Sequence, residues 1–584
     1  MRHRLWASAA CLVLALAVAP ATRATPVAAA GSDWTGYTHD VAGSGFNAAE
    51  TTLGPSNAGN LAVSWKAPGG GGGMSAQPLS VGDVAYWGSW DGNLHATAVR
   101  GAGAGRDLWT RNLGVTHGGP RCRPRNAAMT GTPTFGWIGS TPTLFVADGG
   151  NDAIGGGNVV LSALNAGDGT TEWQTTLTPQ TTDEFAWSSP QLFGGSVYYS
   201  LASLADCPVI QGRVIKLDAA TGAVQATAIT GGGVWGTPTI DAAAGTVFVP
   251  VGGPAPGHAG PFSNALVELN AADLSVVASW TVPAFQQLSD GDFGSVPTLF
   301  RATIGGRARD MVGLGNKNGI FYAWDRANIA AGPVWERPVA IGGNGPQGGG
   351  GTLSPAVWDG TTLFVAGGRT VIGGSDPAQG GVGSRPGGTA CPGSVRALDP
   401  ATGNARWEYC APGHILGPIA GAPGLIAAPA GSSIVLLGAA SGQELFRYDE
   451  PGGGLFWGGP AIAGGRVLAG NMDASLTALA LPATSVTLAP ASQVALVGST
   501  LTVTATVIDG SGGPLAGTPV AFAVTSGPDA GRAGTGVTGR DGRATFSVTG
   551  AVPGADAVQA SFTDPSGAAH ASGPAQLFFM PAVE

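Results

Sequence analysis

One repeating pattern constrains the fold of this chain more than any other feature. The pattern recurs between residues 33 and 482. Each copy begins with a Pro or Gly, followed by a short apolar strand, a Gly turn, two further strands, a D-x-x-T-G turn and a strand with Trp. The inner strand pair begins at eight places, as in "SSPQLFGGSVYYSL", and the outer half recurs, as in "RALDPATGNARW". Units of roughly 40 to 55 residues with four short strands each predict an all-β ring of sheets.

The two ends of the repeat are complementary. The last unit stops at "LTALALP" without an outer strand, whereas "NLAVSWKAP" near the N-terminus is an outer strand without a unit. Residues 60–66 can therefore complete the last sheet, so that no edge stays unpaired. We predict an eight-bladed β-propeller over residues 31–482, closed by this N-terminal strand. Five tryptophans at the ends of units are expected to pack between neighbouring blades: Trp109, Trp173, Trp280, Trp335 and Trp407.

The rhythm changes after Pro482. Residues 485–584 are rich in Val and Thr and alternate in short strands between Gly and Pro turns, which predicts a β-sandwich of immunoglobulin type. The stretches "VGSTLTVTATVIDGSGGPLAGTPVAFAVTSGP" and "TGRDGRATFSVTG" resemble the bacterial Ig-like domains of surface adhesins. Such a module is expected to act as a spacer or to bind a polymer.

The N-terminus and the cysteines predict export. Residues 1–30 combine basic residues with an apolar run too short to span a bilayer, which is typical of a secretory signal peptide. We expect the mature protein outside the cell or at its surface. Without Cys11 four of the five cysteines remain, and four allow three pairings. Cys391 and Cys410 bracket one hairpin-like unit, which favours the disulfides Cys391–Cys410 and Cys122–Cys207.

Composition excludes several classes of function. Charged residues make up 11% of the chain and the net charge is -9 with no basic run, which argues against nucleic acid or an anionic membrane as partner. No later stretch is typical of a transmembrane segment, and we expect a monomer. The sequence has no C-x-x-C-H haem site, no zinc-type spacing and no G-x-S-x-G hydrolase motif.

The repeats resemble a known family. "GSWDGNLHA", "GRVIKLDAATG" and "VRALDPATGNARWEY" are similar to the pyrroloquinoline-quinone (PQQ) repeat, and "DWTGYTHDVAGSGFN" resembles the opening of polyvinyl-alcohol-dehydrogenase-like quinoproteins. The resemblance implies a propeller whose enzymes hold the quinone at the axis, stacked on a Trp beside a Ca²⁺ that carboxylate and amide oxygens bind. An Asp then takes the proton of the alcohol. Non-catalytic scaffolds share the same repeat.

Some positions match this implied site. "GGGVWGTPTIDAAAG" makes Trp235 the stacking platform, "QQLSDGDFGSVP" makes Asp290 or Asp292 the base, and "GLGNKNGIFYAWDR" places Lys317 against the quinone. The alternatives are a turn cap for either aspartate, a hairpin tip for the lysine and a packing ring for the tryptophan.

Other positions of the implied site are lost. Gly253 replaces an asparagine that binds calcium, and Ser75 and Gln77 lie where an acidic residue is expected. Cys122 is followed by Arg123 instead of a second cysteine, and Gln211 replaces an arginine. Without Ca²⁺ the quinone carbonyl loses its activation.

These losses favour one of two functions. The favoured one is a secreted binding or scaffold module with a degenerate PQQ and calcium site, whose partner is a protein, a polymer or a cell-wall component. The alternative is a PQQ-dependent alcohol dehydrogenase, with polyvinyl alcohol as one candidate substrate, that passes electrons to a separate acceptor. Convergence of the four matching residues on one axial pocket would support the second.

Overall fold

The described part of the chain consists of β-strands joined by turns and loops. The computed structural model describes residues 32–101, 103–117, 126–149, 159–178, 184–204, 206–254, 262–343, 348–373, 387–482, 485–509, 513–564 and 569–581. Helical structure within them is limited to short 3-10 turns, namely η1 (Ala58–Asn60), η3 (Ala284–Gln286) and η4 (Ile329–Ala331). The all-β class is therefore confirmed, whereas the expected signal peptide, residues 1–30, lies outside the described residues.

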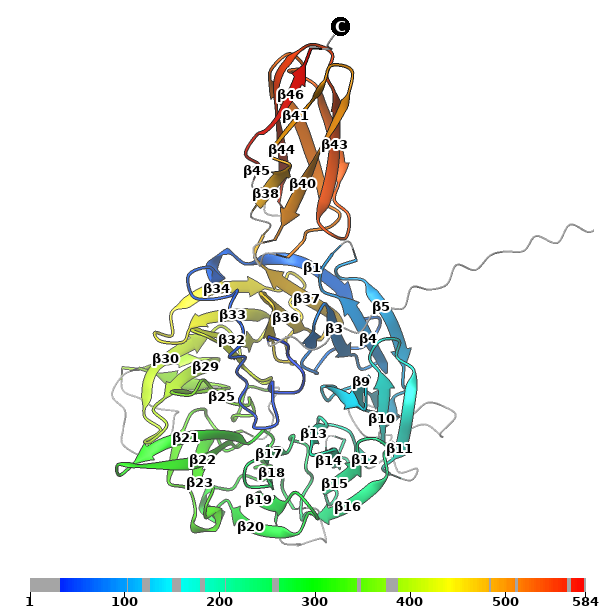
Figure 1. Cartoon of the computed structure of the whole chain (residues 1–584). Helices are drawn as coiled ribbons and strands as arrows, with labels where there is room; N and C mark the ends of the chain where they lie inside the picture. Colours follow the sequence, from blue (N-terminus) through cyan, green and yellow to red (C-terminus); the bar gives the residue numbers. More distant parts are fainter. Residues whose placement is uncertain are drawn as a thin grey trace, which may run out of the picture.

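The first part of the chain forms antiparallel sheets, mostly of four strands, that follow one another around a centre as blades (Figure 1). The strands up to residue 281 are β1 (Ala62–Pro68), β2 (Leu79–Val81), β3 (Val84–Gly88), β4 (Asn93–Ala98), β5 (Asp107–Asn112), β6 (Thr116–His117), β7 (Asn126–Ala127), β8 (Thr134–Ile138), β9 (Thr141–Asp148), β10 (Val160–Asn165), β11 (Thr171–Thr176), β12 (Glu184–Phe185), β13 (Gln191–Phe193), β14 (Ser196–Ser203), β15 (Arg213–Asp218), β16 (Val224–Ile229), β17 (Thr239–Asp241), β18 (Thr246–Val251), β19 (Ala265–Asn270) and β20 (Val276–Thr281). They form the blades β2–β5, β8–β11, β12–β16 and β17–β20, and β6 pairs with β7.

The next segment continues the same arrangement. Its strands are β21 (Thr298–Ile304), β22 (Arg307–Gly315), β23 (Ile320–Asp325), β24 (Trp335–Pro338), β25 (Val357–Trp358), β26 (Leu363–Gly367), β27 (Thr370–Ile372), β28 (Thr389–Cys391), β29 (Gly393–Leu398), β30 (Ala405–Ala411), β31 (Ala420–Ala422), β32 (Leu425–Ala430), β33 (Ser433–Gly438), β34 (Glu444–Asp449), β35 (Ala461–Ala463), β36 (Arg466–Gly470) and β37 (Ser475–Ala480). They form the blades β21–β24, β25-β26-β29-β30, β31–β34 and β35–β37, and β27 pairs with β28.

The N-terminal strand completes the last of these blades. β1 pairs antiparallel with β37, from Ala62 opposite Ala480 to Pro68 opposite Ser475. Trp65 and Leu476 belong to the same buried cluster. The predicted closure by residues 60–66 is confirmed, and it protects an edge of β37 that would otherwise expose unpaired backbone groups.

Tryptophan and glycine of the repeat join neighbouring blades. The indole of Trp173 donates a hydrogen bond of 3.0 Å to the carbonyl of Ala219 in the next blade. Gly222 in that turn has φ +72°, and a Cβ there would lie 2.4 Å from the Trp173 ring, so the D-x-x-T-G turn needs glycine for its conformation and for the contact. The same pairing recurs at Trp109 with Gly169, Trp335 with Gly403 and Trp407 with Gly442. Trp280 packs on Tyr322 and Trp324 of the following blade. Packing between blades is thus confirmed for all five tryptophans.

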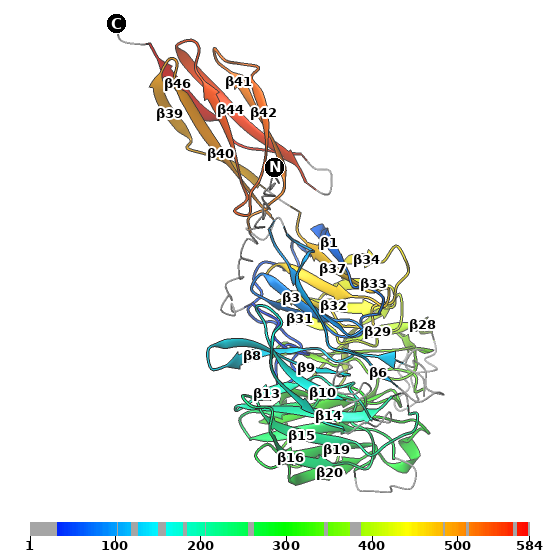
Figure 2. The same cartoon turned by 90° about the vertical axis from the view of Figure 1, so that its right-hand side faces the viewer.

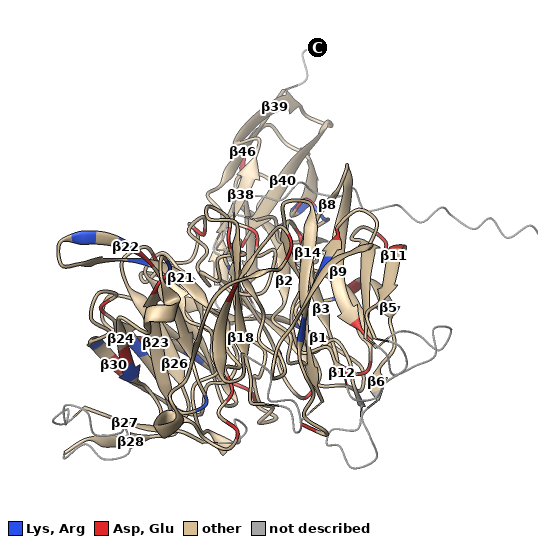
Figure 3. Cartoon of the chain, turned by 90° about the horizontal axis from the view of Figure 1, so that it is seen from below, with Lys and Arg blue, Asp and Glu red and all other residues tan. Residues whose placement is uncertain are grey.

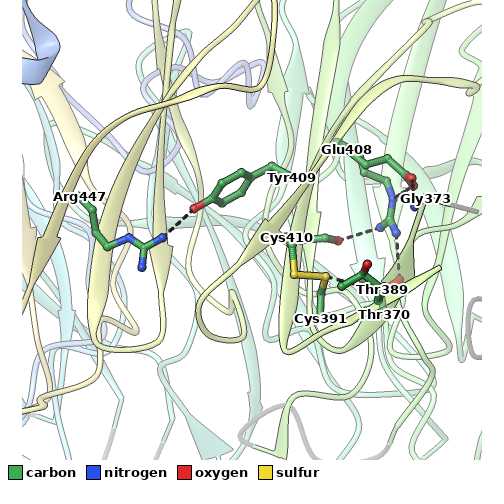
Figure 4. The surroundings of a disulfide bond; sticks show 10 residues. Thr370, Gly373, Thr389, Cys391, Glu408, Tyr409, Cys410 and Arg447 are labelled. Carbon is green, nitrogen blue, oxygen red and sulfur yellow. Dashed lines mark hydrogen bonds and ion pairs between the residues drawn. A yellow bond between two sulfur atoms is a disulfide. The ribbon is translucent and has the colours of Figure 1, made fainter. Parts of the chain in front are cut away.

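One predicted disulfide lies in the described part. Cys391 and Cys410 are bonded, linking the end of β28 to β30 (Figure 4). Beside them Arg396 pairs with Glu408 at 2.9 Å and donates to Thr370. Cys122 lies outside the described residues, so its pairing with Cys207 stays a prediction.

The C-terminal segment forms a β-sandwich that extends away from the propeller (Figures 1 and 2). Its strands are β38 (Ser485–Ala489), β39 (Ser492–Leu496), β40 (Thr500–Ile508), β41 (Pro519–Ser526), β42 (Ala533–Val537), β43 (Arg543–Thr549), β44 (Gly554–Thr563), β45 (Ala569–Ala571) and β46 (Ala575–Met580). One sheet has the order β38-β40-β43, and the other contains β39, β46, β44, β41, β42 and β45. Val503, Phe522 and Leu577 are among the buried residues between them.

A buried ion pair joins the sandwich to the propeller. Arg466 on β36 lies 2.7 Å from Asp509, which follows β40, and each residue is 5% exposed. Arg100, after β4, donates a hydrogen bond of 2.5 Å to the Gly464 carbonyl and lies 4.0 Å from Asp509. This contact shows that the base of the sandwich rests on the last blade.

Removing Arg466 is expected to cost about 3 kcal/mol of unfolding free energy, because Asp509 then stays buried without its closest cation. Calorimetric unfolding of Arg466→Ala would measure the loss. Arg301→Ala is the matched control, since Arg301 pairs with Asp310 at 2.8 Å on the surface, where such pairs contribute below about 1 kcal/mol. Equal losses in the two variants would contradict the role of the buried pair.

Candidate functional site at one end of three blades

The four residues that the resemblance singled out meet at one place. Trp235 lies in the connection between β16 and β17, Asp290 and Asp292 lie between β20 and β21, and Lys317 lies in the turn between β22 and β23. In an up-and-down blade, the connection into the first strand and the turn between the second and third strands lie at the same end. These segments of neighbouring blades therefore converge.

Lys317 is the centre of the cluster. Its Nζ lies 2.6 Å from Asp290 Oδ1 and 2.7 Å from Asp292 Oδ2. The same Nζ lies 5.2 Å from the ring centroid of Trp235, within cation–π range. The Trp235 indole in turn donates a hydrogen bond of 3.3 Å to Asp292 Oδ2. Lys317 is 5% exposed and Asp292 7%, so the charged pair is removed from water.

The environment shifts the pKa values of the two aspartates in opposite directions. Burial alone would raise the pKa of Asp292, but Lys317 and the backbone N–H of Gly253 hold it below its usual range. Burial raises the pKa of Asp290 to about 6, although Lys317 opposes the shift. Burial disfavours the charged form of Lys317, yet the adjacent carboxylates raise its pKa. Asp292 and Lys317 thus form a buried ion pair, whereas the pKa of Asp290 is shifted upward.

Glycines allow the chain segments to approach this closely. A Cβ at Gly294 would lie 1.9 Å from two atoms of the Trp235 ring, so only glycine lets the indole reach Asp292. Gly253 donates its backbone N–H to Asp292 Oδ1 at 2.5 Å. The backbone N–H of Lys317 donates to the Asp292 carbonyl at 3.1 Å. The carboxylate and the lysine are therefore positioned by main-chain contacts as well as by each other.

Sequence reasoning missed Asp206, in the β14–β15 connection. A carboxylate oxygen from each of Asp206, Asp290 and Asp292 lies within 4.8 Å of those from the other two. Burial and the charge of Asp292 raise the pKa of Asp206. Charged residues are sparse along the chain (Figure 3), so three carboxylates around one lysine form an unusual concentration. Nothing in the local sequence marks Asp206, because only the arrangement of blades brings it to the other two.

Three of the positions at which the sequence departs from the implied site have partners in the described part of the chain. Gly253 contributes only its backbone N–H to the cluster. Gln77 is fully buried, where it accepts from the Thr38 backbone and donates to the Pro460 carbonyl. The hydroxyl of Ser75 accepts from the Trp90 indole. Both have structural partners, and neither supplies an acid. Cys122 and Arg123 lie outside the described residues.

The donor set fits a hard cation and a flat anionic cofactor. Three carboxylates face one ammonium group, which leaves excess negative charge for a cation such as Ca²⁺, whose preferred ligands are oxygens. Trp235 is partly exposed and offers an aromatic surface beside the Lys317 charge. The residues present therefore fit both groups that the resemblance implied, with one of the implied calcium ligands missing at position 253.

The fold is a propeller with a charged cluster at one end of three blades, and comparisons with known proteins identify two segments of the chain. Residues 216–346 match the family model of the glucose, ethanol and alcohol dehydrogenase β-propeller domain, the PQQ family. Residues 483–573 match the bacterial Ig-like domain, group 1. The chain thus contains one segment that matches the PQQ β-propeller family model and, after it, one that matches a bacterial Ig-like domain. A search of curated proteins gave no match.

Solved structures agree on the fold. The chain is similar to the quinohemoprotein alcohol dehydrogenase from Comamonas testosteroni, with TM-score 0.58, 16% identity and coverage of 77% of this chain and 80% of the other. The alcohol dehydrogenase ADHIIG from Pseudomonas putida HK5 gives TM-score 0.58, 14% identity and the same coverage. A europium-containing methanol dehydrogenase gives TM-score 0.58, 14% identity, and 77% and 98% coverage. In the part of the chain that the structure describes, no helix is long and apolar enough to span a membrane.

Proposed function

We propose that the protein is an exported quinone-dependent dehydrogenase that oxidises an alcohol, built on a closed ring of eight blades. The convergence of Trp235, Asp290, Asp292 and Lys317 carries this proposal. If the aspartates only capped a turn, the lysine only formed a hairpin tip and the tryptophan only packed between blades, we would not expect these residues to meet in one cluster. The geometry thus favours the dehydrogenase over the binding module that the sequence favoured, and the expected signal peptide supports export.

Each residue has a distinct task in this proposal. Asp290, with 28% of its side chain exposed and a pKa raised to about 6, accepts the hydroxyl proton of the alcohol. Asp292, held by Lys317 and the Gly253 backbone, keeps Lys317 in position. Lys317 and the Trp235 ring hold and orient the cofactor. When bound, the quinone would take the C–H hydrogen of the alcohol together with the two electrons, and a Ca²⁺ beside it would polarise its carbonyl.

The charge of the cluster makes quinone uptake dependent on a cation. Three carboxylates repel an anionic quinone, and Lys317 balances one of them. We expect stoichiometric quinone binding by calorimetry in the presence of Ca²⁺, and binding at least about tenfold weaker after chelation of the metal. Dye-linked alcohol oxidation should follow the same dependence. Absence of quinone uptake with Ca²⁺ present would refute the dehydrogenase.

A binding module is the second candidate, and exposed apolar surface at the same inter-blade connection favours it. Phe285 in η3, five residues before Asp290, is 86% exposed. Such a side chain suits contact with a polymer or a protein partner. The two functions are compatible, because a polymeric alcohol held at this surface would lie near the axial site. Without a haem attachment motif in the sequence, the electrons must leave to a separate acceptor.

A further inference from the structure

A buried asparagine lies beside the position where the calcium-binding residue is lost. Asn264 is 6% exposed, and among the described residues its Oδ1 has no hydrogen-bond partner. A buried amide oxygen without a partner is costly unless something else binds it. We propose that Asn264 supplies, from a second position in the same loop, the neutral oxygen ligand that Gly253 lacks, in a cation site shared with Asp206 and Asp292. The proposal rests on the axial site of the proposed function.

The location of Asn264 Oδ1 supports this replacement. A Cβ built on Gly253 would lie 3.8 Å from Asn264 Oδ1 and 3.4 Å from Asp292 Oδ1. Both oxygens therefore border the space that a side chain at position 253 would occupy. The backbone N–H of Asn264 donates to the Gly252 carbonyl at 2.7 Å, which fixes Asn264 next to this pair of glycines. The amide oxygen thus lies beside the space that a residue-253 ligand would occupy.

The carboxylates provide the rest of the donor set. Ligand oxygens of Asp206, Asp290 and Asp292 lie within 4.8 Å of one another, and Asp292 is the carboxylate nearest to Gly253. Carboxylates together with one neutral amide oxygen are typical of sites for Ca²⁺ and for lanthanide ions of similar size. Because Lys317 balances one of the three negative charges, the remaining two match a divalent ion.

The backbone conformation at Asn264 determines which substitution tests the proposal. Its φ is +47°, in the left-handed region where asparagine is tolerated better than most residues with a Cβ. Glycine would adopt the same conformation without strain. This comparison also defines the cleanest variant, since Asn264→Gly removes the oxygen and keeps the turn.

The test measures cation binding by the full chain without any quinone. Calorimetric titration with Ca²⁺, and luminescence of Tb³⁺ sensitised by tryptophan, report the affinity directly. Asn264→Gly is expected to weaken binding of both ions by about tenfold or more. Asn264→Asp keeps an oxygen and should bind at least as tightly as the wild type. Adding Gly253→Asn to Asn264→Gly should recover most of the lost affinity, because a ligand then returns from the neighbouring position.

Unchanged Ca²⁺ affinity in Asn264→Gly would overturn the proposal. It would also be overturned if Asn264→Asp lost as much Ca²⁺ affinity as Asn264→Gly and added Gly253→Asn restored none of it. Thermal unfolding in chelator shows whether the variants fold as the wild type does. Failure of the proposed function looks different: Ca²⁺ binding would still depend on Asn264, but no quinone would bind. The converse result is a protein that takes up quinone while substitution of Asn264 leaves its Ca²⁺ affinity unchanged. That result would support the proposed dehydrogenase and contradict the assignment of Asn264 as a ligand.

Discussion

Replacing Asp290 by asparagine is expected to lower kcat for alcohol oxidation by about 10²- to 10⁴-fold, because the variant cannot accept the hydroxyl proton. Asparagine keeps an oxygen toward Lys317 Nζ, which lies 2.6 Å from Asp290 Oδ1 in the wild type. Quinone uptake should therefore persist. Steady-state oxidation with an artificial electron acceptor, together with calorimetric titration of the quinone, separates the two effects.

Asp292→Asn serves as the comparison for this experiment. Asp292 is 7% exposed and accepts hydrogen bonds from Lys317, Trp235 and the Gly253 backbone, so its loss should impair uptake of quinone and Ca²⁺ rather than proton transfer alone. The expected pattern is binding without turnover for Asp290→Asn and weak binding for Asp292→Asn. Normal kcat in Asp290→Asn, or the reverse pattern, would contradict the assignment of Asp290 as the base.

Replacing Lys317 by methionine is expected to lower the unfolding free energy of the unliganded protein by about 3 to 5 kcal/mol. The change leaves Asp290 and Asp292 close together without the cation that lies 2.6 and 2.7 Å from them. Lys317→Arg should lose less, because the charge remains. Equilibrium unfolding in urea at neutral pH, with chelator present, measures the difference.

Lys216→Met is the matched control for this prediction. Lys216 Nζ also lies over an aromatic ring, 5.8 Å from the Tyr198 centroid, but its hydrogen bond goes to the Ala272 carbonyl on the surface. Its removal should cost less than about 1 kcal/mol. Similar losses for Lys216→Met and Lys317→Met would mean that the carboxylates around Lys317 do not determine its contribution.

Local patterns predicted the propeller because each repeat contains the residues that pack it against the neighbouring blades. The turn glycines need positive φ and lie against a tryptophan of the preceding blade, as Gly222 does against Trp173. The incomplete first and last units predicted the pairing of β1 with β37. These features depend on short spacings and on nearest-neighbour contacts, which the sequence records directly.

The axial site was only partly predictable. The resemblance identified Trp235, Asp290, Asp292 and Lys317, but the distances that join them depend on loops from two neighbouring blades. Asp206 comes from a third blade, and its neighbours in sequence carry no metal-binding spacing. The loss at Gly253 was visible in the sequence, whereas the nearby oxygen of Asn264 became apparent only from the fold of the loop.

A crystal structure of the full chain grown with PQQ and Ca²⁺ tests the central claim most directly. We predict density for the planar quinone on the Trp235 ring next to Lys317, with a cation among oxygens of Asp206, Asp292 and Asn264. A structure that holds neither group at this end of the propeller, although both were supplied above stoichiometry, would contradict it.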